Sequence, residues 1–250
     1  MKAMILAAGL GSRLKPITNS IPKALVKVGG IPMLDRIIHT LIKQGFTDIT
    51  VNIHHFADMI KKHIESNDYG IKINMSDESQ MLLDTGGGIV KAIPFLFKEN
   101  NHPVLFHNVD ILSDADLAEM MKGIDESETH ATLLVSQRES DRKLIFDEDI
   151  YLRGWHNTKE NKFKPENLQK RATWKEFSFN GIYAMDKNSI GEMKDLMGTG
   201  KFSVMDYFLH PKRKYGIRGV VSENLHILDI GKPATLSQAE SLLDKMNLAY

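Results

Sequence analysis

Short apolar runs alternate with segments of helical periodicity along the first half of the chain. Strand-like apolar runs are expected at residues 2–7, 48–53, 71–76, 103–110 and 131–137. Apolar residues recur every three or four positions, as on one face of a helix, at 33–45, 56–66, 85–97 and 114–124. This alternation predicts an α/β fold with a Rossmann-like, mostly parallel sheet and helices on both of its faces.

Two glycine-containing segments predict where helices begin and end. In residues 33–45 the apolar positions are typical of a helix that is buried on one side, and Gly45 is suited to end it. In residues 85–97 the helix is expected to begin after the run Gly86, Gly87 and Gly88, since glycine is a poor helix former.

The pattern changes after residue 140. Residues 151–177 are polar, contain scattered aromatic side chains and follow no sustained period, which is typical of short antiparallel strands and loops. A strand is expected at 177–186 and a final helix at 233–248. We therefore expect a single domain over residues 1–250, with a small antiparallel insertion in its second half.

Charge and composition exclude several classes of function. The 32 basic residues balance the 32 acidic ones, so no overall field attracts nucleic acid or an anionic membrane. Any anion that the protein binds must be held by a local site. The absence of cysteine excludes disulfides, thiolate metal sites and a cysteine nucleophile.

The beginning of the chain imitates a secretory signal, because Lys2 precedes the apolar residues 3–8. This apolar stretch is too short for the core of a signal peptide, so we interpret it as a buried strand. No window approaches the roughly 20 apolar residues of a membrane span. We expect a soluble, cytoplasmic protein with no membrane partner.

A glycine-rich loop follows the first strand. A phosphate-binding P-loop needs a Gly-Lys-Ser/Thr step that does not follow Gly9 and Gly11. A dinucleotide-binding fingerprint needs a third small residue where this chain has Leu14, and Pro16 and Pro22 disfavour an immediate helix.

Basic residues in that loop indicate a phosphate-binding site. Glycines allow backbone N–H groups to approach phosphate oxygens closely, while the guanidinium of Arg13 and the ammonium of Lys23 supply positive charge. The alternative interpretation is a structural turn with solvated charges.

Longer motifs help to distinguish a phosphate-binding loop from a structural turn. "LAAGLGSRLKPIT" and "PKALVKVGGIPML", followed by "DTGGGI", "HNVDIL", "FNGIY" and "LDIGKPATL", resemble in this order the sugar-1-phosphate nucleotidyltransferases. Within that family, "VNIHHFADMI", "LLDTGGGI" and "RGWHN" are most similar to the N-acetylmuramate-1-phosphate uridylyltransferases of cell-wall recycling. The mannose-1-phosphate guanylyltransferases are the alternative branch.

The resemblance implies an Mg²⁺-dependent enzyme. It would transfer a nucleotidyl group from a nucleoside triphosphate, UTP in the favoured branch, to a sugar 1-phosphate, N-acetylmuramate 1-phosphate in that branch, and release pyrophosphate. Residues 1–140 would form mainly the nucleotide-binding half and 141–250 mainly the sugar-binding half. A catalytically inactive regulatory protein with the same fold is a competing hypothesis. The sequence does not indicate an oligomeric state.

The resemblance also implies the reacting centre. Arg13 is expected to bind the leaving pyrophosphate, and Lys23 is expected to lie near the α-phosphate. Asp110 and Asp229 each end a strand, at the edge of the sheet where ligands of α/β proteins bind, and are expected to coordinate Mg²⁺. The alternative role for either aspartate is capping a helix N-terminus.

The remaining expected site residues surround the substrates. The expected nucleotide-binding residues are Ala7, Ala8, Gly9, Gly11, Arg13, Lys23, Asn52, Asp84 and Gly86. For Asp84 and Gly86 a flexible strand-to-helix turn is the alternative interpretation. The sugar-binding candidates are Asn180 and Gly181, in a strand where relatives commonly read Asn-Ala-Gly-Ile-Tyr. The roles of His54, His55, Trp155 and Trp174 are left open between substrate contact and packing.

Overall fold

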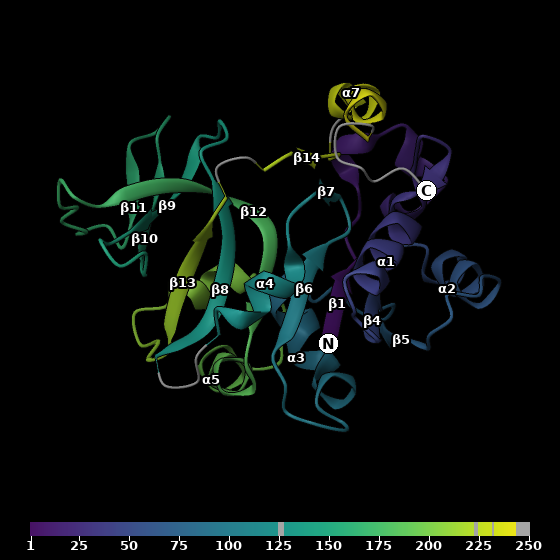
Figure 1. Ribbon diagram of the computed structural model, residues 1–250, viewed down its shortest axis with the longest axis horizontal. Helices are drawn as coiled ribbons and strands as arrows, with labels where there is room; N and C mark the ends of the chain where they lie inside the picture. The colour runs from purple at the N-terminus through teal and green to yellow at the C-terminus, as the bar shows by residue number, and fades with distance from the viewer. Residues whose placement is uncertain (125–127, 223–224, 232, 244–250) are drawn as a thin grey trace.

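The computed structural model describes residues 1–124, 128–222, 225–231 and 233–243, without the side chains of 240 and 242 (Figure 1). The helices are α1 (Met33–Lys43), α2 (Ala57–Glu65), α3 (Asp84–Leu96), α4 (Leu117–Lys122), α5 (Lys187–Met197), α6 (Val204–Phe208) and α7 (Pro233–Leu243), with 3₁₀ turns η1 (Ser12–Leu14), η2 (Ile17–Asn19) and η3 (Lys23–Leu25). The strands are β1 (Lys2–Leu6), β2 (Lys27–Val28), β3 (Ile31–Pro32), β4 (Asp48–Ile53), β5 (Ile73–Asp77), β6 (Val104–Asn108), β7 (Ile111–Ser113), β8 (Thr129–Ser136), β9 (Arg142–Phe146), β10 (Leu152–Asn157), β11 (Lys162–Lys164), β12 (Lys175–Met185), β13 (Gly216–Val221) and β14 (Ile227–Asp229).

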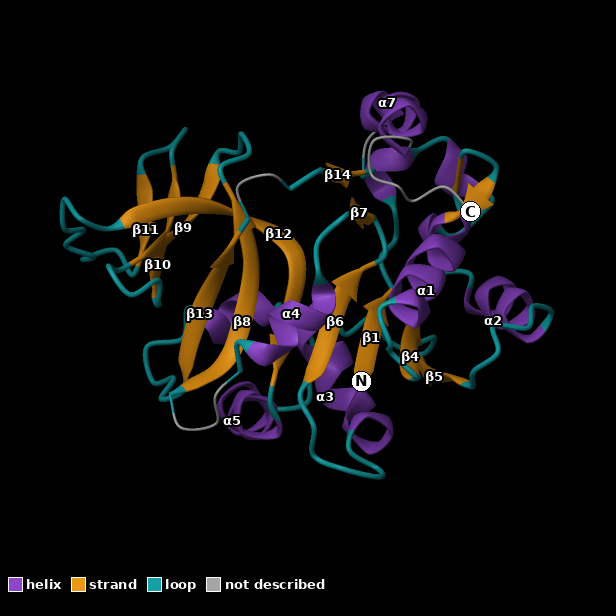
Figure 2. Cartoon of the chain, in the orientation of Figure 1, coloured by secondary structure: helices purple, strands orange, loops and turns teal. Residues whose placement is uncertain are grey.

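The central sheet confirms the expected mostly parallel α/β architecture. Strands β5, β4, β1 and β6 lie side by side and are all parallel (Figure 2). Strand β12 then pairs antiparallel with β6 on one side and with β8 on the other, and β13 pairs parallel with β8. The predicted strand around β8 thus runs in the same direction as β6, but a strand from the second half of the chain separates the two.

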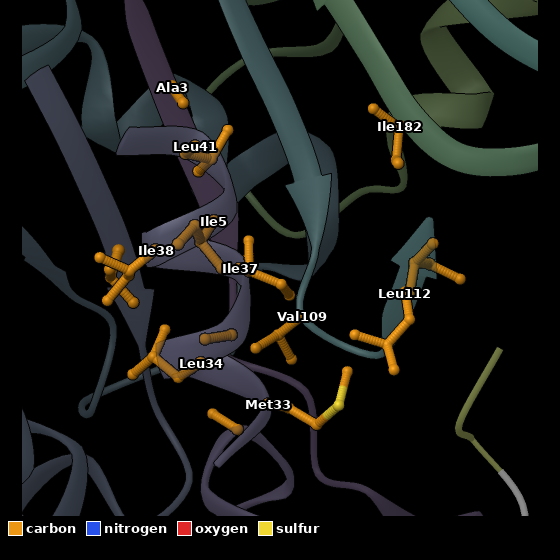
Figure 3. Packing of buried hydrophobic residues seen from close by; sticks show 14 of the residues in the cluster. Ala3, Ile5, Met33, Leu34, Ile37, Ile38, Leu41, Val109, Leu112 and Ile182 are labelled. Atoms are coloured by element: carbon orange, nitrogen blue, oxygen red, sulfur yellow. The ribbon is translucent and has the colours of Figure 1, made fainter. Parts of the chain in front are cut away.

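Helices cover both faces of the sheet because successive side chains of each strand point to opposite faces. In β1, Ala3 and Ile5 pack with α1, as Figure 3 shows, in a cluster that also includes residues of α2, α4 and α7. Met4 and Leu6 of the same strand belong to a second cluster, formed with α3, α5 and α6. Both clusters are buried, so a hydrophobic core lies on each side of the sheet.

The expected antiparallel insertion is confirmed. Strands β9, β10 and β11 form an antiparallel set that joins the first residues of β12, and Figure 1 shows them together at one end of the molecule. The remaining part of β12 belongs to the central sheet. One long strand therefore connects the insertion to the core of the fold.

The sheet register aligns the ends of the parallel strands. Leu6 at the end of β1 pairs with Asn52 on one side and with Asn108 on the other. The loops that follow these strands therefore leave from one edge of the sheet. A small antiparallel pair, β7 with β14, extends the structure beyond that edge.

The expected start of α3 is wrong. The helix begins at Asp84 and therefore includes the glycine run that was expected to precede it. The reason is close packing, because an added Cβ would lie 2.2 Å from the ring of Phe202 at Gly86 and 2.2 Å from the carbonyl oxygen of Gly200 at Gly87. Helix α7 is described as far as Leu243, and the rest of the predicted final helix lies outside the described residues.

Helix α1 ends as its sequence predicts. Gly45 has φ 85°, and its N–H donates to the carbonyl oxygen of Ile42 at 2.9 Å. The N–H of Phe46 donates to the carbonyl oxygen of Leu41 at 3.0 Å, which completes a Schellman motif. Among the described residues, no helix combines the length and the apolar character that crossing a membrane requires.

We predict that Gly45→Ala lowers the free energy of unfolding by about 1 kcal/mol, because alanine is disfavoured at positive φ. The nearest atom to an added Cβ would be 3.7 Å away, so backbone strain at positive φ and not a clash causes the effect. Gly191→Ala is the matched control, since Gly191 lies inside α5 with no atom within 4 Å of an added Cβ. That control should raise stability by up to about 1 kcal/mol. Denaturant unfolding followed by circular dichroism measures both, and shifts of the same sign would contradict the explanation.

Candidate active site

The glycine-rich loop after β1 is wound into short 3₁₀ turns instead of an α-helix. Gly11 has φ 63°, and its carbonyl oxygen accepts hydrogen bonds from the N–H of Leu14 at 2.9 Å and the hydroxyl of Thr18 at 2.8 Å. A Cβ on Gly11 would lie 2.8 Å from the methyl group of Thr18. Glycine is therefore required here both for its backbone conformation and for space.

Two aspartates far apart in the sequence come together at the edge of the sheet. Asp110 lies in the turn between β6 and β7, and Asp229 is the last residue of β14. Pairing of β14 with β7 places Asp229 opposite Ile111, and the N–H of Ile230 donates to the carbonyl oxygen of Asp110 at 2.8 Å. Backbone hydrogen bonds therefore hold the two carboxylates beside each other.

The two predicted cationic residues meet these aspartates. Lys23 donates a hydrogen bond from Nζ to Oδ2 of Asp110, in an ion pair whose side chains are both 13% exposed. Arg13 Nη2 lies 3.7 Å from Oδ2 of Asp110, and its Nη1 lies 3.9 Å from Oδ2 of Asp229. The side chain of Arg13 is 56% exposed, so its guanidinium is open to an anionic ligand.

The carboxylate pair fits a magnesium ion. Asp110 and Asp229 offer hard oxygen ligands, and the N–H of Gly231 donates to Oδ1 of Asp229 at 2.8 Å, which orients that carboxylate. Among the described ranges, no group of three or more histidine, aspartate or glutamate side chains is placed to hold a metal. Magnesium commonly binds through one or two carboxylates and takes its other ligands from phosphate and water.

A cleft of about 240 Å³ begins at this charged cluster. Asp110 and Lys23 line it together with Ala8, Gly9 and Asp84. An added Cβ at Gly9 would find no atom within 4 Å, so the backbone there is open to a flat ligand. The cleft therefore combines a charged end with a small-residue surface.

The other expected nucleotide-binding residues lie partly in the cleft wall and partly outside it. Asn52 also lines the cleft, whereas Ala7, Gly11 and Gly86 are not among its lining residues. The N–H of Ala7 donates to Oδ1 of Asn52 at 2.7 Å, and the N–H of Gly86 donates to the carbonyl oxygen of Phe202 at 3.0 Å. The N–H groups of Ala7 and Gly86 are thus occupied within the protein.

Glu78 is a residue of this region that sequence reasoning missed. Its carboxylate is fully buried and accepts hydrogen bonds from Nδ2 of Asn52 at 2.7 Å and from the N–H of Leu83 at 3.2 Å. Burial raises the pKa of Glu78 above its usual value. The carbonyl oxygen of Glu78 also contacts Nδ1 of His54 at 2.7 Å, which gives that histidine a packing role. Because Asn52 also accepts the hydrogen bond from Ala7, Glu78 connects the loop after β1 to the start of α3.

Asp84 adopts an unusual backbone conformation at the beginning of α3. Its φ is 61°, a region that glycine favours and that aspartate tolerates better than most residues. Its Oδ1 accepts a hydrogen bond from the N–H of Thr85 at 2.7 Å, and the residue is exposed to the cleft. A strained residue in a cleft is typical of a functional position.

The two expected sugar-binding residues lie on β12, next to the cleft. Asn180 is buried, and its Oδ1 accepts a hydrogen bond from Nε of Arg138 at 2.9 Å. Gly181 has φ 72°, and an added Cβ would lie 2.8 Å from Nδ2 of Asn108, another lining residue. Arg138 was missed by sequence reasoning, because a polar loop residue after a strand carries no distinguishing pattern.

The two tryptophans lie on the antiparallel insertion and not in the cleft. Trp174 donates from Nε1 to Oε2 of Glu148 at 3.1 Å, and Nζ of Lys164 lies 5.8 Å from the ring centroid of Trp155. Among the alternatives left open, these contacts favour packing within the insertion.

Comparison with known proteins gives the family. The nucleotidyl transferase family model matches residues 2–144. The N-acetylmuramate alpha-1-phosphate uridylyltransferase of Caulobacter vibrioides is 40% identical over 111 residues, which cover 43% of this chain and 45% of that protein. The D-glycero-alpha-D-manno-heptose 1-phosphate guanylyltransferase of Campylobacter jejuni is 27% identical over 241 residues, which cover 93% of this chain and 96% of that protein.

A solved structure shows the same fold. HddC from Yersinia pseudotuberculosis, complexed with GMP-PN, superimposes with a TM-score of 0.74 at 24% identity, over 96% of this chain and 98% of that chain. The matched region spans about half the length of the uridylyltransferase relatives. Since the family model nonetheless covers more than half of the 250 residues, this chain belongs to the nucleotidyl transferase family.

Proposed function

We propose that the protein transfers a nucleotidyl group from a nucleoside triphosphate to a sugar 1-phosphate and releases pyrophosphate. The observation that carries this proposal is the convergence of Asp110, Asp229, Arg13 and Lys23 at one end of the cleft. A triphosphate needs concentrated positive charge, which this electrically neutral chain supplies only locally.

The proposed reaction is an in-line attack by a phosphate oxygen of the sugar 1-phosphate on the α-phosphorus. A phosphate monoester is already anionic, so positioning and charge neutralisation can drive the step without a strong general base. In this proposal Lys23 binds the α-phosphate, and Arg13 binds two oxygens of the leaving pyrophosphate at once. The 56% exposure of the Arg13 side chain and the contact of Lys23 with Asp110 support these roles. A magnesium ion held by Asp110 and Asp229 would neutralise phosphate charge and polarise the α-phosphorus.

For the substrates, we propose UTP and N-acetylmuramate 1-phosphate. The support is the local similarity to uridylyltransferases that carry this sugar in their names, together with the motifs of residues 51–60, 82–89 and 153–157. The guanylyltransferase alternative is supported by a relative that aligns over nearly the whole chain, although at lower identity. We also propose that residues 1–140 bind mainly the nucleotide and residues 141–250 mainly the sugar.

The metal assignment predicts that Asp110→Asn and Asp229→Asn each lower kcat at least ~100-fold, because a neutral amide is a much weaker magnesium ligand. A pyrophosphate-release assay at several magnesium concentrations measures the effect. Asp195→Asn, an exposed aspartate on α5, is the matched control and should retain wild-type turnover. Wild-type turnover in either site variant would refute the metal site.

The assignment of Arg13 predicts a different signature. Arg13→Ala should lower kcat by about 100-fold with little change in the affinity for the sugar phosphate, because the guanidinium neutralises charge that develops on the leaving group. Steady-state kinetics with the acceptor varied separate the two quantities. Arg142→Ala, an exposed arginine at the start of β9, serves as the control. A rise in acceptor KM at unchanged kcat would contradict the role.

Substrate choice is tested by crossing UTP, GTP, CTP and dTTP with the 1-phosphates of N-acetylmuramate, N-acetylglucosamine, mannose and glucose. We expect the highest kcat/KM for UTP with N-acetylmuramate 1-phosphate, the pair that the similarity to the uridylyltransferases favours. Hydrogen bonds to the base and to the sugar would decide the preference for each substrate separately. A preference for GTP with mannose 1-phosphate would overturn the substrate proposal. Absence of pyrophosphate release with every pair would favour the inactive regulatory protein.

A further inference from the structure

A second, larger cavity lies beside the antiparallel strands. Its volume is about 640 Å³, within the range of about 300–1,000 Å³ typical of small-molecule sites. Its walls come from the ends of β8 and β13, the first part of β12 and the strand β14. Phe177 and Ile150 provide apolar surface, and Ser136 provides a hydroxyl group. The cavity thus offers both flat apolar contact and polar groups, as a sugar requires.

Two cationic side chains lie in the part of the cavity wall that the structure describes. They belong to Arg138 and Lys175, and none of the described lining residues is an aspartate or a glutamate. The ammonium of Lys175 has no hydrogen bond or ion pair with any part of the chain that the structure describes. Arg138 uses Nε for Asn180 and Nη2 for the carbonyl oxygen of Phe179 at 2.8 Å, and its Nη1 makes no hydrogen bond with the described residues. The side chains of Arg138 and Lys175 can therefore both donate hydrogen bonds to an anionic ligand.

Strand β14 links the cavity wall to the proposed reacting centre. Ile227 lines the cavity, and Asp229 follows it by two residues in the same strand, so the two side chains point to the same face. Burial lowers the pKa of Arg138, and the charge of Asp229 opposes that shift. Arg138 also donates to Asn180, and the next residue, Gly181, packs against Asn108 of the cleft wall. Arg138 is thus the cation of this cavity that lies towards the cleft.

Lys175 lies at the beginning of β12. It precedes Phe179, the backbone partner of Arg138, by four residues, which correspond to roughly 13 Å of extended chain. A ligand that carries a single phosphate at the Arg138 end would leave Lys175 without a partner. A ligand with a second negative group, on a different part of the sugar, would pair with both cations.

We propose that this cavity binds the acceptor and selects a sugar 1-phosphate that carries a second anionic group, with Arg138 binding the phosphate and Lys175 binding that second group. The inference rests on the proposed transfer reaction. N-acetylmuramate 1-phosphate fits this chemistry, because its lactyl ether bears a carboxylate that N-acetylglucosamine 1-phosphate lacks. Lys175 is then a specificity-determining residue.

The experiment compares acceptors that differ in this one charge. N-acetylmuramate 1-phosphate, its lactyl amide and N-acetylglucosamine 1-phosphate are assayed by pyrophosphate release with UTP and, without nucleotide, by isothermal titration calorimetry. We expect the wild type to prefer the carboxylate over the amide in both measurements. Lys175→Met should reduce this preference by about tenfold or more, since a charged hydrogen bond is lost. Lys175→Arg should retain it, and Arg138→Gln should weaken all three acceptors together.

Lys194→Met, an exposed lysine on α5, is the matched control and should leave the preference as in the wild type. A preference for the carboxylate that persists in Lys175→Met would overturn the inference, and so would a wild type without this preference in calorimetry. Failure of every acceptor to release pyrophosphate would instead count against the proposed reaction. Calorimetry would still decide whether the cavity distinguishes the carboxylate from the amide.

Discussion

Two negative and two positive side chains balance one another at the edge of the sheet. Asp110 and Asp229 would repel each other if they stood alone, and Lys23 and Arg13 offset that repulsion from the loop after β1. The balance is local, because the chain as a whole carries no net charge. The two cations can also act separately. The exposed guanidinium of Arg13 can turn to a ligand while Lys23 remains near Asp110. A site of this kind can exchange internal ion pairs for contacts with phosphate and metal.

The rest of the fold brings these four side chains together. The parallel strands end in register, so the loops that carry Arg13, Lys23 and Asp110 leave from the same edge. The pairing of β14 with β7 returns the late Asp229 to that edge. Behind the loop, the buried hydrogen bonds from Ala7 through Asn52 to Glu78 hold the backbone that lines the cleft. The cleft is therefore shaped by backbone register and buried polar contacts, with the charged side chains at one end.

Sequence patterns predict the parts of this structure that depend on local periodicity. The apolar spacing of α1 and the glycine after it indicate the helix and its end, and the alternation of strands and helices indicates the class of fold. Contacts between distant residues explain what the patterns miss. Positions 86 and 87 are glycine inside a helix because Phe202 and Gly200 approach too closely for any side chain. Glu78 and Arg138 gain their roles from partners 26 and 42 residues away, and neither stands in a distinctive motif.

The strand order of the central sheet has a consequence for the evolution of this chain. Because β12 is inserted between β6 and β8, its edges must match strands encoded much earlier in the gene. The second half of one relative cannot simply be recombined with the first half of another, since a chimaera would have to preserve the hydrogen bonds of β12 to both β6 and β8. Divergence in such a lineage is expected to proceed by substitution within cavity walls, with whole segments inherited together.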